Sequence, residues 1–179
     1  MHPVLATGVA PLLHELSSLS ESQMQLSPAA NPKRWSIQQI AEHLLLTYDQ
    51  TTRNISNRLE RKTPTRREST LLQKVLRFIV LMLGLTARGL PAPESTIAKN
   101  IQPQSGEAIA NRITTSLELM DSRLHEARNT FGMLPVAYHP FFVPMRVEQW
   151  RRFHAVHARH HLKQIHQILI EHGIKIEAA

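Results

Sequence analysis

Hydrophobic residues recur along most of this chain at the spacing of amphipathic α-helices, three or four positions apart. This pattern predicts five helices, over residues 5–25, 36–61, 71–87, 106–129 and 146–172. Segments rich in proline and turn residues separate them, and no stretch alternates between apolar and polar residues as a half-buried strand does. We therefore expect an all-α fold, a four-helix bundle with long loops and with residues 71–87 as an additional, buried helix.

The second helix has the clearest start signal. Ser36 is a good N-cap, and Gln39, three residues later, completes a capping box. Trp35 and Ile40 flank this cap at the spacing of a hydrophobic staple. At the other end of the chain, Gly173 is placed to cap the last helix.

The composition suits one globular domain over residues 1–179. Hydrophobic residues make up 42% of the chain, aromatic residues make up only 5%, and there are six glycines. This composition is more typical of helical proteins than of β-sheet proteins. The chain has no cysteine, which excludes disulfides, thiolate metal ligands and a cysteine nucleophile.

No targeting or membrane-spanning segment is evident. The N-terminus lacks a basic region followed by a long apolar run. The most apolar stretch, residues 75–85, contains Arg77 and is far shorter than the roughly 20 residues that cross a bilayer. We expect a soluble cytoplasmic protein without a membrane partner.

The formal net charge of +7 raises the question of a nucleic-acid partner. Much of the excess lies between Arg53 and Arg67, at a helix end that runs into a loop. Such a segment can hold phosphates, but no aromatic residues interleave with it for base stacking. A solvated basic face is the favoured interpretation, and nucleic-acid binding is the alternative.

The last predicted helix carries two histidines on its inward face. His157 and His161 are four residues apart, one turn of helix, so both imidazoles can bind one metal ion. They belong to an apolar stripe at about 100° per residue, made up of Trp150, Phe153, His157, His161, Gln164 and Ile168. Buried histidines need a hydrogen-bond partner or a metal, and the spacing alone leaves both open.

A metal site of this kind needs a third protein ligand. His43 is a candidate because its helix must pack near the last one, yet its place beside the apolar stripe fits an exposed boundary residue equally well. Composition and spacing do not decide between these interpretations.

Three blocks of sequence together resemble the DinB/YfiT-like metalloenzyme superfamily. They are Trp35-Ser-Ile-Gln-Gln-Ile-Ala-Glu-His43-Leu, then His139-Pro-Phe-Phe, and finally Trp150 followed by His157, His161 and Gln164. Their order and separation match the family from about Trp35 to Glu171. The resemblance implies a DinB-like four-helix bundle that binds a divalent metal ion, zinc or nickel, through His43, His157 and His161.

The resemblance also implies an activity. Family members include transferases that add a low-molecular-weight thiol to an electrophile, and others are hydrolases or isomerases. We expect a metal-dependent enzyme, with thiol transfer to a small-molecule substrate as the leading chemistry. A metal-dependent hydrolase, a non-catalytic stress-associated bundle and a nucleic-acid-binding module are the alternatives. Val143 and Lys163 stand where relatives often have glycine, and these departures concern the loop that shapes the substrate pocket rather than the three ligands.

Further residues receive roles around this site. Gln164, one turn after His161, is placed to orient an imidazole or a bound water, with capping of a buried polar pocket as the alternative. His139 lines the pocket entrance or anchors its loop, and Trp150 packs in the core or stacks on a ligand. Glu42 points about 100° away from His43 and is a poor general base. Finally, the apolar segment 71–87 offers a face for a homodimer.

Overall fold

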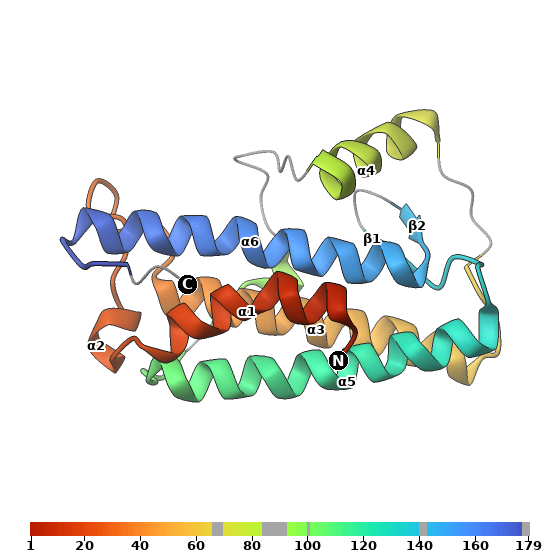
Figure 1. The fold of residues 1–179 in the computed structure, drawn as a ribbon, viewed down its shortest axis with the longest axis horizontal. Coiled ribbons are helices and arrows are strands. Elements are labelled where there is room, and N and C mark those ends of the chain that lie inside the picture. Colours follow the sequence, from red (N-terminus) through yellow and green to blue (C-terminus); the bar gives the residue numbers. More distant parts are fainter. Residues whose placement is uncertain (66–69, 84–92, 100, 140–142, 177–179) are drawn as a thin grey trace.

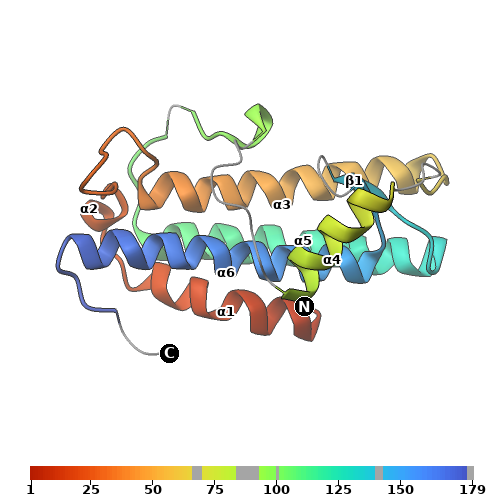
Figure 2. The same cartoon turned by 90° about the horizontal axis from the view of Figure 1, so that it is seen from above.

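The computed structural model describes residues 1–65, 70–83, 93–99, 101–139 and 143–176, and most of them are helical (Figure 1). Four long helices lie alongside one another in both views (Figures 1 and 2): α1 (Pro3–Ser17), α3 (Ile37–Glu60), α5 (Gly106–Phe131) and α6 (Val147–Glu171). The shorter elements are α2 (Glu21–Met24), α4 (Leu71–Leu83), the 3-10 helix η1 (Glu94–Thr96), and strands β1 (Ala137–His139) and β2 (Val143–Met145). The expected all-α bundle is confirmed.

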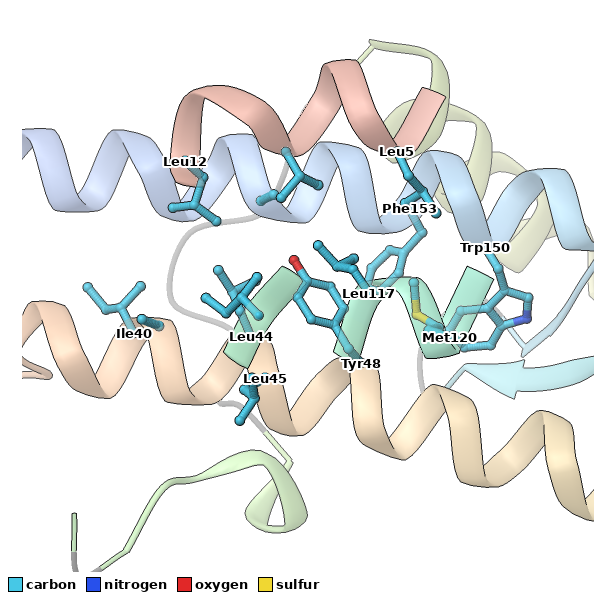
Figure 3. Packing of buried hydrophobic residues seen from close by; sticks show 14 of the residues in the cluster. Leu5, Leu12, Ile40, Leu44, Leu45, Tyr48, Leu117, Met120, Trp150 and Phe153 are labelled. Carbon is cyan, nitrogen blue, oxygen red and sulfur yellow. The ribbon is translucent and has the colours of Figure 1, made fainter. Parts of the chain in front are cut away.

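The core lies between the four long helices, where each contributes the apolar stripe of its sequence (Figure 3). Among its fully enclosed side chains are Leu5, Leu12, Leu44, Tyr48, Leu117 and Met120. Helices α1 and α6 approach one another closely at Gly8, where a β-carbon would overlap that of Ala155. This bundle places the first half of α3 beside the middle of α6.

The predicted ends of two helices are confirmed. Helix α3 begins directly after Ser36, whose hydroxyl accepts a hydrogen bond from the backbone N–H of Gln39 while the Gln39 side chain accepts one from the Ser36 N–H. After α6, Gly173 adopts a positive φ of 69°, as a residue that ends a helix does.

The first predicted helix, over residues 5–25, is wrong as a single element. It is divided into α1 and α2, because the backbone N–H of Ser18 bonds to Glu15 and ends α1. Ser20 then caps α2 through a second capping box with Gln23. The apolar spacing continues across this break, and only the cap residues mark it.

The loop expected over residues 131–144 contains a short β-ribbon. Strands β1 and β2 pair antiparallel, with Ala137 opposite Met145 and His139 opposite Val143. Strands of three residues are too short to produce an alternating pattern, which is why the sequence did not predict them. Residues 140–142 lie outside the described part of the chain.

The helix predicted over residues 71–87 is present as α4 over its described part, residues 71–83, and residues 84–87 lie outside that part. Its prediction as a buried helix is wrong. Leu71, Leu72 and Phe78 are 78%, 68% and 58% exposed, because α4 lies on the outside of the bundle against α6 (Figures 1 and 2). None of the helices in the described ranges is long and apolar enough to span a bilayer.

Candidate metal centre

Three histidines from two helices meet inside the bundle. His43 lies in the second turn of α3, seven residues after the N-cap Ser36, and only 5% of its surface is exposed. His157 and His161 lie one turn apart on α6, as their spacing predicted. The interpretation of His43 as an exposed boundary residue is therefore wrong.

The three rings direct nitrogens at a common point. The Nε2 atom of His157 lies 2.9 Å from that of His161 and 3.4 Å from that of His43. One nitrogen from each ring lies within 4.8 Å of the other two. Three nitrogens this close, from side chains with no carboxylate between them, form a group that could hold a metal ion.

Hydrogen bonds on the far side of two rings fix their tautomers. His43 Nδ1 lies 2.8 Å from the backbone carbonyl oxygen of Thr96, and His161 Nδ1 lies 2.8 Å from Oε1 of Gln164. Both partners are acceptors, so each Nδ1 carries the hydrogen and donates it. Both Nε2 atoms are therefore left with a lone pair that points at the common centre.

His157 alone does not satisfy these two lone pairs. Its ring has one Nε2 hydrogen at most in the neutral form, which serves one neighbour and leaves the other without a donor. A cation at the centre would accept all three lone pairs at once. The donor set thus fits a metal ion better than it fits a network of hydrogen bonds.

Burial keeps the three imidazoles neutral, which is the form that binds metals. Desolvation is the largest cause in each case: it lowers the pKa of His43, and it lowers that of His161 to about 3. The pKa of His157 is also lowered far below its usual value, by burial and then by the nearby His161. At neutral pH none of the three competes for a proton.

Aromatic rings enclose the group. Trp35 lies against His43, with ring centroids 5.1 Å apart, and Phe153 stacks on His157 at 5.2 Å. The Nδ1 atom of His157 is buried with no hydrogen-bond partner in the described part of the chain, so the stack on Phe153 holds this ring. By side-chain exposure His157 is half-buried, whereas His43 and His161 are buried.

The other sequence-predicted site residues lie at different distances from this group. Gln164 contacts His161 directly, through the hydrogen bond between its Oε1 and Nδ1 of His161. His139 and Trp150 pack against Phe153, at centroid distances of 4.5 and 5.9 Å, and so lie one ring away from His157. Both are buried in the core and neither belongs to the group of three.

Glu42 and the described part of the basic segment, residues 53–65, do not belong to the group of three histidines. Glu42 accepts two hydrogen bonds from the guanidinium of Arg112, at 2.6 and 3.2 Å. Arg53 and Arg61 are exposed on the last turns and C-cap of α3. Arg66 and Arg67 lie outside the described residues.

Two contributors to the site were not found in the sequence. Thr96 acts through its backbone carbonyl, which every residue possesses, so no side-chain pattern marks it. Trp35 was assigned to the cap of α3, and its ring also covers His43. The position of Trp35, next to the capping box and eight residues before His43, was the signal that could have indicated this contact.

Comparison with known proteins identifies a family. A model of the DinB superfamily matches residues 7–165, which include all four long helices at least in part and all three histidines. No curated protein and no solved structure matches the chain.

Proposed function

This chain belongs to the DinB superfamily, and on that basis and that of its three facing histidines we propose that it is a metal-dependent enzyme. We further propose His43, His157 and His161 as the ligands of one divalent ion, zinc or nickel. The chemistry that the family resemblance favours is transfer of a low-molecular-weight thiol to an electrophilic small molecule.

The observation that carries this proposal is the orientation of His43 and His161. Thr96 and Gln164 each hold an Nδ1 hydrogen, which aims the opposite Nε2 lone pair at the centre. Three neutral protein ligands resemble catalytic zinc sites, in which at least one position stays free for water or substrate. A bound divalent ion there supplies a Lewis acid that lowers the pKa of a coordinated thiol or water.

The residues around the histidines would bind and orient the reactants. The chain has no cysteine, so the thiol has to come from a second substrate. A substrate would reach the centre past His157, the least buried of the three ligands by side-chain exposure. The rings of Trp35 and Phe153 form apolar walls that limit the access of water to a thiolate held there.

An assay with a model reaction tests the proposed activity. Protein loaded with zinc or nickel is incubated with a low-molecular-weight thiol and chlorodinitrobenzene, and thioether formation is followed by absorbance. We expect formation above the uncatalysed rate with wild type and its loss in His157→Ala. The His125→Ala variant, altered at an exposed histidine of α5, should retain the wild-type rate.

Ester and amide substrates form the second arm of this experiment. Hydrolysis of these substrates without thiol transfer would replace the proposed transferase by a metal-dependent hydrolase that uses the same ligands. If fully metal-loaded protein catalyses neither thiol transfer nor hydrolysis, the enzymatic proposal is contradicted and only a metal-binding bundle is left.

A further inference from the structure

Helix α4 turns its apolar face away from the protein. Leu71, Leu72 and Phe78 are 78%, 68% and 58% exposed, and Val75 and Leu76 are 46% and 41% exposed. The side toward the bundle carries Leu81, which is buried, and Arg77, whose Nη1 donates to the carbonyl oxygen of Pro144 at 2.8 Å. A surface helix ordinarily has the opposite orientation, with its apolar stripe on the core.

Positive charge gathers behind this helix. A cavity of about 460 Å³ lies between α4, the start of α6 and the N-terminus, and Lys74, Arg77, Arg151 and Arg152 line it together with Phe78 and a single acid, Glu148. Asp121 balances Arg151 through an ion pair at 2.8 Å. The nearby charge of Arg146, after burial, lowers the pKa of Arg77, which shows how closely these cations are placed.

The order of these groups along one direction is that of a helix lying on a lipid bilayer. Outermost are Leu71, Leu72, Val75 and Leu76, and Phe78 lies at the edge of the cavity; next is the helix itself, and the cations lie on its inner side. Interfacial helices bury their apolar face about 5–10 Å into the headgroup boundary, which leaves basic side chains at the level of the phosphates. A helix that lies on the surface of a bilayer can be much shorter than one that crosses it.

We propose that α4 docks this protein on the surface of an anionic lipid bilayer. Leu71, Leu72, Val75, Leu76 and Phe78 enter the acyl boundary, and the two exposed cations of the cavity, Lys74 and Arg152, contact lipid phosphates. The net charge of +7 attracts the whole chain toward such a surface. A second copy of the chain carries the same positive charge, and a nucleic acid has no apolar surface to cover α4.

Co-sedimentation with vesicles tests this docking. The full chain is mixed with vesicles of phosphatidylglycerol and phosphatidylcholine, or of phosphatidylcholine alone, at low and high salt. We expect binding to the anionic vesicles that weakens with salt, and at least tenfold weaker binding to neutral ones. His157→Ala should bind vesicles as wild type does, because the three histidines do not line the cavity.

Paired variants separate the contribution of the apolar side chains to vesicle binding from that of the cations. Leu72→Ser with Phe78→Ser should weaken binding at least tenfold, because two side chains no longer enter the apolar boundary. Lys74→Glu should weaken it at least fivefold. The matched controls are Leu119→Ser with Ile170→Ser, which are 51% and 59% exposed away from α4, and Lys33→Glu, which changes the net charge as Lys74→Glu does. The double serine control should bind as wild type does, and Lys33→Glu should weaken binding less than Lys74→Glu.

Three results would overturn the proposal. They are failure of wild type to bind anionic vesicles at low salt, equal binding by wild type and the Leu72→Ser/Phe78→Ser variant, and equal binding to anionic and neutral vesicles. A wild-type dimer that this variant converts to a monomer, without any vesicle binding, would assign the apolar face to contact between two copies. All positions changed in the paired variants and their matched controls are exposed, and circular dichroism verifies that the helices are intact.

Discussion

Each imidazole in the candidate metal centre depends on the partner of its other nitrogen. Oε1 of Gln164 accepts a hydrogen bond from Nδ1 of His161, and the Nε2 atom of Gln164 lies 3.1 Å from Nε2 of His160. Such partners fix the tautomer and the orientation of a ligand, and their loss typically costs 10–100-fold in metal affinity. Gln164 lies outside the proposed ligand set but determines the direction of one of its lone pairs.

Replacement of Gln164 tests this orienting role. Gln164→Leu should weaken zinc binding about 10–100-fold, measured by competition with a chromogenic chelator. Gln164→Glu keeps an oxygen acceptor and should retain most of the affinity. Gln167→Leu, at an exposed glutamine that bonds to Glu171, is the matched control. Unchanged affinity in Gln164→Leu would show that the His161 ring is held without this contact.

The fully buried His154 makes folding sensitive to acid. Its Nε2 lies 3.1 Å from the hydroxyl of Thr51, and desolvation lowers its pKa to about 3. The unfolded chain, with an ordinary histidine pKa near 6.5, binds the proton first. The contribution of His154 to the free energy of unfolding is therefore fully present above about pH 6.5 and is lost as the pH falls toward 3.

Urea unfolding of metal-free protein at pH 7.5 and pH 5.0 measures this contribution. His154→Gln should lose about 2 kcal/mol less stability over this interval than wild type, since one buried base no longer has to stay neutral. His125→Gln, at an exposed histidine, should show the wild-type pH dependence. Equal losses in His154→Gln and wild type would mean that His154 does not remain neutral in the folded chain.

Spacing found two of the three facing histidines but not the third. His157 and His161 follow from i, i+4 geometry on one helix, whereas His43 is brought to them by packing between α3 and α6. Periodicity placed His43 at a boundary, and only the family resemblance selected it. Their role as metal ligands stays a prediction.

Among the elements, those with local start and stop signals were predicted well. The cap at Ser36 and the left-handed Gly173 depend on neighbouring residues alone. The direction in which α4 faces, by contrast, is not encoded in its own periodicity, because the same stripe serves a core or an outer surface. The break before α2 was hidden by apolar spacing that continues through it.

The close approach of α1 and α6 can be tested at Gly8. A β-carbon there would overlap that of Ala155, so Gly8→Ala should destabilise the fold by about 1–3 kcal/mol in urea unfolding. In an unobstructed helix the same change stabilises by about 1 kcal/mol. The double variant Gly8→Ala/Ala155→Gly should recover most of the loss. Stabilisation by Gly8→Ala alone would contradict the close approach.

For the whole molecule, the bundle and the centre depend on one another. The DinB superfamily match covers residues 7–165, and within it the three histidines of the centre join α3 to α6. A metal that binds the folded chain but not the unfolded one stabilises the fold in proportion to its affinity and concentration. The zinc or nickel identity, the thiol substrate and the enzymatic role all rest on this one site.

Elemental analysis of purified protein is the most direct test of the site. Wild type and His125→Ala should carry about one divalent ion per chain. His43→Ala, His157→Ala and His161→Ala should each lose most of it, while circular dichroism reports intact helices. Full metal occupancy in the His157→Ala/His161→Ala double variant would contradict the assignment of these histidines as ligands.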